Sequence, residues 1–105
     1  MRRKLIRHKI PDIIARSGKR AVVREADRSE MPTLLHEKFS EEVLEFFEKP
    51  SVEEACDIYE VFLETLRHWD IDFSSVVNHA YYKREEKGGF GRRVVLEEIK
   101  GKTVG

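Results

Sequence analysis

The chain has 105 residues, 40% of them hydrophobic, and its 20 basic and 20 acidic side chains give a formal net charge of zero. This length predicts one compact domain over residues 1–105, and no apolar run reaches the roughly 18 residues that a membrane span requires. The start of the chain does not resemble a signal peptide, so we expect a cytoplasmic protein. Cys56 is the only cysteine, which excludes an internal disulfide and a thiol zinc site and predicts a buried, inert thiol.

The two signs of charge are segregated along the chain. Residues 1–24 hold nine Lys or Arg against one acid, whereas residues 25–64 hold thirteen Asp or Glu against three Lys or Arg. A fold that brings the basic ends over the acidic middle would create a site for both a cation and a polyanion. Because so short a chain buries a modest part of its surface, we also expect a homo-oligomer whose subunits complete one another's core.

The first quarter of the chain predicts one short helix between two strands. KLIR, residues 4–7, reads as a brief strand. Pro11 suits a first helical turn and Gly18 suits a helix end, which predicts a helix over residues 10–18. The β-branched residues of KRAVVREA predict a strand over residues 19–26.

Two amphipathic helices follow. Between Ser29 and Lys49 apolar residues recur at spacings of three and four, and Pro50 ends that helix. Ser51 is a good N-cap and Glu54 completes a capping box, so a second helix continues to about Trp69. The stripe that this helix would bury consists of Val52, Ala55, Tyr59, Phe62, Leu66 and Trp69. The joint between the helices is short, so they should lie antiparallel.

A third helix and a last strand complete the prediction. Asp72 or Ser74 would cap the helix, and Gly88 with Gly89 would end it. Its inward face would be Phe73, Val76, Val77, Ala80 and Tyr81. RRVVLEEI, residues 92–99, reads as a strand that could pair with residues 19–26. The fold class is therefore mainly α, an antiparallel helical bundle with short N- and C-terminal strands.

Acidic residues concentrate where the first two long helices meet. Glu42 and Glu45 are three residues apart, with Glu41 at their flank, and Glu54 and Asp57 repeat that spacing on the next helix. Two unit charges about 6 Å apart repel by roughly 3 kcal/mol at an effective dielectric of 20. If the helices bring these groups together, a cation is needed, and carboxylates without Cys or paired His favour Mg²⁺, with Mn²⁺ as the alternative.

Other interpretations of the same residues stay open at this point. The carboxylates could form a solvated helix face, with Glu54 acting only as a cap. A di-iron bundle is disfavoured, because its Glu-x-x-His pairs are missing. A helical interaction module could bind a partner protein through its acidic middle and basic ends. A nucleic-acid binder could use the basic N-terminal region, although the zero net charge argues against it.

Three segments carry a resemblance to a known family. Glu41, Glu42 and Glu45, followed by Glu54 and Asp57, resemble the EExxE…ExxD pattern of the all-α nucleoside triphosphate pyrophosphohydrolases, the MazG superfamily. KLIRHKIPDII and KREEKGGFGRRVVL resemble a small MazG-like branch whose members begin with LVRDKIP and carry RGGF. The chain departs from that branch at His8, at Lys87 and in the shorter gap between the two acidic motifs.

The resemblance implies hydrolysis of a nucleoside triphosphate between its α and β phosphates, giving the monophosphate and pyrophosphate. It suggests the removal of non-canonical nucleotides as the biological role. It implies Glu42, Glu45, Glu54 and Asp57 as metal ligands and Glu41 as the general base. Basic residues must then meet the phosphates. The candidates are Arg7, Lys9, Lys83, Arg84 and Lys87, each of which could equally be an ordinary solvated cation. The superfamily also forms dimers or larger oligomers.

Overall fold

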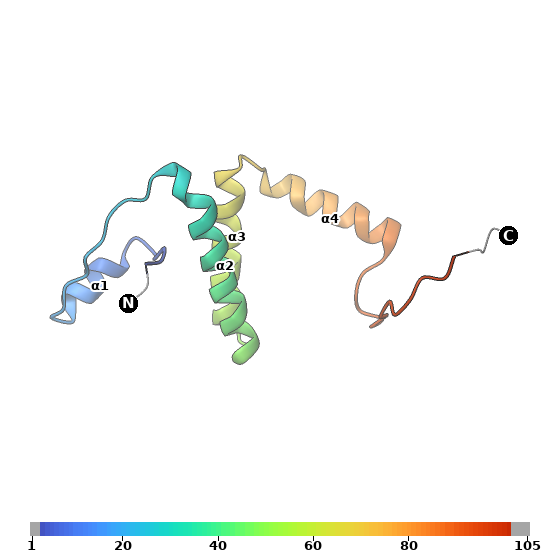
Figure 1. Ribbon diagram of the computed structural model, residues 1–105, viewed down its shortest axis with the longest axis horizontal. Helices are drawn as coiled ribbons and strands as arrows, with labels where there is room; N and C mark the ends of the chain where they lie inside the picture. Colours follow the sequence, from blue (N-terminus) through green and yellow to red (C-terminus); the bar gives the residue numbers. More distant parts are fainter. Residues whose placement is uncertain (1–2, 102–105) are drawn as a thin grey trace. The chain divides into compact units, whose positions relative to one another are not determined.

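The computed structural model describes residues 3–101 and contains helices joined by loops (Figure 1). The elements in chain order are α1 (Ile10–Arg16), the 3₁₀-helix η1 (Arg28–Glu30), α2 (Met31–Glu48), α3 (Val52–His68) and α4 (Phe73–Lys87). The prediction of a mainly α chain is confirmed. Contacts within the chain divide it into two compact units, Met1–Phe73 and Ser74–Gly105, which are described one at a time. A single domain over residues 1–105 stays a prediction.

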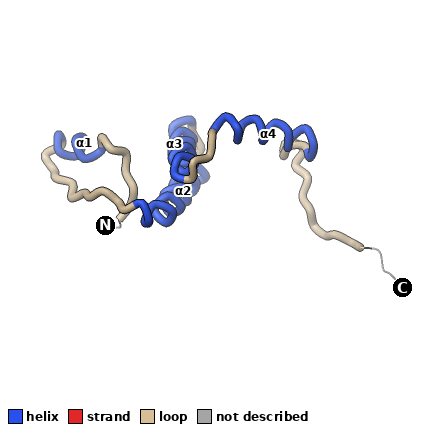
Figure 2. The backbone as a smooth tube through the Cα atoms, turned by 90° about the horizontal axis from the view of Figure 1, so that it is seen from above, coloured by secondary structure: helices blue, strands red, loops and turns tan. Residues whose placement is uncertain are grey.

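The three predicted strands do not form within residues 3–101, where Figure 2 shows only helix and loop. Residues 4–7, 19–26 and 92–99 are loop segments, and Val22 and Val94 are 87% and 86% exposed. A β-branched run becomes a strand only when another strand satisfies its backbone groups and covers one of its faces. These segments have the composition of strands but no ladder partner in the described chain.

Helix α1 begins and ends as the sequence predicts. Pro11 lies in its first turn, where the missing N–H costs nothing. At its end the Gly18 N–H donates to the Ala15 carbonyl at 3.0 Å and the Lys19 N–H donates to the Ile14 carbonyl at 3.3 Å. This is a Schellman motif, and Gly18 supplies its left-handed residue with φ of +87°.

Helices α2 and α3 form the predicted antiparallel hairpin and lie side by side (Figure 1). The chain turns between them at Lys49, Pro50 and Ser51, because Pro50 cannot continue the hydrogen-bond ladder of α2. Leu35, near the start of α2, and Leu66, near the end of α3, are the two apolar side chains that are fully buried among the described residues, at 3% and 7% exposed. These two positions mark where the hairpin is packed most tightly.

Part of the predicted buried stripe of α3 is wrong. Val52, Tyr59 and Trp69 are 89%, 48% and 56% exposed. The side of α3 that loses solvent contact passes instead through Glu54, Ile58, Val61, Phe62, Thr65 and Leu66. The first turn of this helix therefore turns a carboxylate rather than a valine toward α2.

Cys56 is exposed, which corrects the prediction of a buried thiol. Each helical residue adds about 100° around the axis, so Cys56 lies roughly 200° from Glu54. The rotation that turns Glu54 toward α2 thus turns Cys56 away from it.

The second unit contains all of α4 except its first residue, Phe73. Asp72 directly precedes the helix, and Gly88 follows it with φ of +83° and donates its N–H to the Arg84 carbonyl at 2.8 Å. Along the predicted inward face only Val76 is partly buried, and Val77 and Tyr81 are about half exposed. Within residues 3–101, none of the helices combines the length and the apolar character that crossing a bilayer requires.

Candidate metal centre

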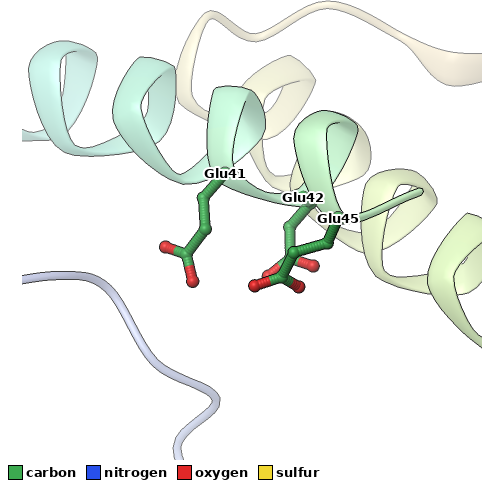
Figure 3. Close-up of side chains that lie close together, drawn as sticks. All are labelled: Glu41, Glu42 and Glu45. Carbon is green, nitrogen blue, oxygen red and sulfur yellow. The ribbon is translucent and has the colours of Figure 1, made fainter. Parts of the chain in front are cut away.

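Helix α2 turns three carboxylates to one side. One oxygen from each of Glu41, Glu42 and Glu45 lies within 4.8 Å of the others. Figure 3 shows their carboxylate groups extending from the same side of α2. Positions three and four apart share a helix face, and Glu41 precedes Glu42 on that face. The sequence-predicted cluster on this helix is therefore present in the structure.

Helix α3 adds its two carboxylates to the same place. One oxygen from each of Glu42, Glu54 and Asp57 lies within 4.8 Å of the others, so Glu42 belongs to both groups. The hairpin makes this possible, because the turn at Pro50 places the first turn of α3 beside the last turns of α2. The convergence that spacing alone predicted is confirmed through Glu42.

Ser51 caps α3, but the predicted capping box is incomplete. The Ser51 Oγ accepts a hydrogen bond from the Glu54 backbone N–H at 3.1 Å. The Glu54 carboxylate does not return a bond to Ser51 within the described structure and lies among the other carboxylates instead. The prediction of a complete capping box is therefore wrong, and only the Ser51 half of it forms.

Glu42 is the most deeply placed acid of the cluster. The residue is 6% exposed, and its Oε2 atom, like the Glu54 Oε2 atom, is buried without a hydrogen-bond partner. A buried carboxylate oxygen without a partner costs free energy unless a cation or a donor reaches it. Carboxylate oxygens are also the ligands that Mg²⁺ and Mn²⁺ prefer. The residues present therefore fit a hard divalent cation.

Crowding of like charges raises the pKa of the Glu45 carboxyl. The charge of Glu42 raises the pKa of the Glu45 carboxyl above its ordinary value, and desolvation, Glu41 and Glu54 add to the increase. A carboxylate group surrounded by other carboxylates gives up its proton less readily. A metal ion bound here would remove that penalty, because it replaces the proton.

Three cations partly neutralise the cluster. Lys38 Nζ lies 3.1 Å from Glu42 Oε1 and 3.6 Å from Glu41 Oε1. Two more cations come from the N-terminal segment: Lys4 Nζ lies 3.3 Å from Glu41 Oε1, and Arg7 Nη2 lies 2.8 Å from Asp57 Oδ1. Five carboxylates against these three cations leave two negative charges, which is the charge that one divalent cation would balance.

Of the two predicted phosphate contacts in the first unit, Arg7 lies beside the carboxylates. Lys9 is exposed at the N-cap of α1. Lys83, Arg84 and Lys87 lie on α4 in the second unit. At the end of α4 the Gly88 N–H donates to the Arg84 carbonyl, so Gly88 ends this helix as the sequence predicts.

Sequence reasoning missed two functional candidates, Lys4 and Lys38. Lys38 could have been found, because it precedes Glu41 by three residues and Glu42 by four and must share their helix face. Lys4 is 37 residues from its partner Glu41, and no local pattern connects them.

Comparisons of the chain with protein-family models, with curated proteins and with solved structures gave no match.

Proposed function

We propose that this chain is a MazG-like nucleoside triphosphate pyrophosphohydrolase that acts in the cytoplasm with Mg²⁺, or with Mn²⁺ in its place. Water attacks between the α and β phosphates, and the products are a nucleoside monophosphate and pyrophosphate. The observation that carries the proposal is the buried Glu42. It belongs both to the set of carboxylates on α2 and to the set that includes two residues of α3, and its Oε2 atom has no hydrogen-bond partner.

Each carboxylate has a role in this proposal. Glu42, Glu45, Glu54 and Asp57 would hold the metal, which when bound neutralises charge on the leaving pyrophosphate and lowers the pKa of a bound water. Glu41 lies at the edge of the cluster, where Lys4 and Lys38 are its neighbours. From that edge its carboxylate could accept a proton from the attacking water, as a general base.

The polyphosphate of the substrate needs cations beyond the metal. Arg7, already beside Asp57, is the phosphate contact that the geometry supports most directly. Lys9, Lys83, Arg84 and Lys87 remain candidates on the strength of the sequence. Removal of non-canonical nucleotides is the biological role that the family resemblance suggests.

We further propose a homo-oligomer. Leu44 and Phe47 on α2 are 62% and 75% exposed, and Val52 on α3 is 89% exposed. Large apolar side chains that are exposed on neighbouring helices are typical of surfaces that another protein surface covers. A second copy of the hairpin would supply apolar faces of the same kind.

The alternative is a helical interaction module that would bind a partner protein through its segregated acidic and basic surfaces. Lys4 and Arg7 in the basic N-terminal region are paired with carboxylates of the same chain. Because both cations are about half exposed, such a module could exchange these pairs for the charges of a partner, so measured turnover decides between the two functions.

A substrate panel tests the proposed function. Purified protein would be incubated with canonical and modified nucleoside triphosphates, with Mg²⁺ and then with a chelator, and pyrophosphate would be measured. We expect metal-dependent release that Glu42→Gln and Asp57→Asn each abolish, while Glu60→Gln, an exposed carboxylate on α3, leaves it unchanged. Wild-type turnover in both site variants would refute the ligand assignment. No release from any triphosphate would refute the function and favour the interaction module.

A further inference from the structure

The N-terminal segment reaches both acidic helices. Lys4 contacts Glu41 on α2 and Arg7 contacts Asp57 on α3, across sequence separations of 37 and 50 residues. In Figure 3 the pale blue N-terminal stretch of the ribbon passes beside the carboxylates of α2. The segment therefore spans the edge of the cluster from one helix to the other.

These two ion pairs are easily exchanged. The Lys4 and Arg7 side chains are 47% and 55% exposed, whereas the Lys38 side chain is 17% exposed. Exposed pairs of this kind contribute little to stability, because water and salt screen them. Arg7 contacts Asp57 through Nη2 and also interacts with the Cys56 side chain. Its planar guanidinium has five N–H donors, so it can also bind a multivalent acceptor such as phosphate.

An observation independent of these pairs indicates that a ligand belongs at the cluster. The Glu42 side chain is 8% exposed, and its Oε2 atom is buried without a hydrogen-bond partner. Glu42 is also the residue that the two sets of neighbouring carboxylates have in common. Lys4 contacts Glu41 and Arg7 contacts Asp57, so neither cation satisfies this oxygen.

We propose that Lys4 and Arg7 form an exchangeable arm that senses the substrate. Without substrate they neutralise Glu41 and Asp57. When the metal and the polyphosphate of a nucleotide bind, both cations leave the carboxylates for the phosphate oxygens. This frees Asp57 for the metal and leaves Glu41 with Lys38 as its neighbouring cation, so that its carboxylate can accept a proton from the attacking water. This inference rests on the proposed function and assigns the N-terminal arm to the recognition of polyphosphate.

The exchange predicts effects of opposite sign on two ligands. In Arg7→Gln, Asp57 loses a competing cation, so Mn²⁺ alone should bind about two- to fivefold more tightly. The same variant loses a charged phosphate contact, so an α,β-methylene nucleoside triphosphate with Mn²⁺ should bind about tenfold more weakly or worse. Lys4→Gln should show both effects to a smaller extent. A purely structural role would weaken both ligands together.

The test is calorimetric titration of the full chain, first with Mn²⁺ and then with the methylene analogue. Arg7→Lys keeps the charge but loses the guanidinium fork, so Mn²⁺ affinity should stay near the wild type and analogue binding should weaken less than in Arg7→Gln. Arg16→Gln, which removes one charge at an exposed position in the last turn of α1, is the matched control and should change neither affinity. Circular dichroism would check that every variant retains its helices.

The outcomes separate this inference from the proposed function. Tighter Mn²⁺ and weaker analogue binding in Arg7→Gln support the arm. Unchanged Mn²⁺ affinity, or unchanged analogue affinity, in both Lys4→Gln and Arg7→Gln overturns it, even if the wild type binds both ligands. A wild type that binds Mn²⁺ but no analogue refutes the proposed function and the phosphate half of the inference. A wild type that binds no Mn²⁺ overturns both halves of the inference.

Discussion

Lys38 holds its ammonium group between two carboxylates of its own helix. It lies N-terminal to Glu41 and Glu42, which is the less favourable order for an ion pair along a helix. The pair is also largely removed from water, which costs desolvation energy. Helix stabilisation therefore does not account for Lys38, whereas the need of the buried Glu42 for a counter-charge does.

Replacing Lys38 with Met should destabilise the chelator-treated protein by about 1–2 kcal/mol, because Glu42 would keep a buried charge with no cation beside it. Saturating Mg²⁺ should reduce that difference, since the metal supplies the missing charge. Thermal unfolding with and without Mg²⁺ measures both effects. Lys49→Met, at the exposed end of α2, is the control and should change little. Equal stability of Lys38→Met and the wild type would contradict this role.

A second ion pair lies outside the cluster and predicts a pH dependence. Arg24 donates two hydrogen bonds to the Glu30 carboxylate at 2.8 and 2.7 Å, and the Asp27 N–H donates a third at 3.0 Å. These bonds, those of Arg24 above all, lower the pKa of Glu30 from 4.5 to about 2. A depressed folded-state pKa stabilises the fold above the unfolded value, and the contribution is lost as the pH falls from about 4.5 to about 2.

Arg24→Gln should return the Glu30 titration midpoint toward its ordinary value, because the main cause of the shift is removed. Carbon-13 NMR of the side-chain carboxyl over an acid titration measures it. Arg16→Gln should leave the midpoint at about 2. A wild-type midpoint near 4.5 would show that the pair does not persist in solution.

At the scale of elements, two serines have opposite local effects. Ser51 accepts the Glu54 N–H at the start of α3 and so satisfies one of the free donors of that helix. Ser40, in the middle of α2, donates instead to the His36 carbonyl, which is already a helix acceptor.

Ser51→Ala should therefore cost about 1 kcal/mol of folding free energy. Ser40→Ala, the matched substitution at an exposed position, should be neutral or slightly stabilising, because Ala has the higher helix propensity. Chemical denaturation measures both. If the two variants were equally destabilised, Ser51 would not be acting as a cap.

The elements that could be predicted from the sequence are those specified by nearby residues. Pro11, Gly18, Pro50 and Ser51 act within one helical turn, and the ends of the helices fall where they predict. The strands failed because pairing depends on a distant partner. The carboxylate cluster was predictable from two short spacings and one turn, whereas the contact of Lys4 with Glu41 depends on how a loop crosses the hairpin.

At the scale of the whole molecule, the hairpin leaves several large apolar side chains exposed. Leu35 and Leu66 are its fully buried apolar side chains among the described residues, while Leu44, Phe47 and Val52 are mostly exposed. So small a core stabilises a domain of this length poorly. The proposed oligomer would cover these side chains.

Light scattering coupled to size-exclusion chromatography should give a mass of at least two chains. Phe47→Glu should lower that mass to about one chain, because burying an unpaired carboxylate in an apolar interface is costly. Val22→Glu, at an 87% exposed loop position, should not. A monomeric wild type would contradict the proposed oligomer.

We propose that the carboxylates of α2 and α3 hold one divalent cation around Glu42. Calorimetric titration of Mn²⁺ into chelator-treated protein, without nucleotide, tests it most directly. We expect about one Mn²⁺ per chain in the wild type and in Glu60→Gln, and binding weakened tenfold or more in Glu42→Gln. Equal Mn²⁺ binding by the wild type and Glu42→Gln, or no binding by either, would contradict the account.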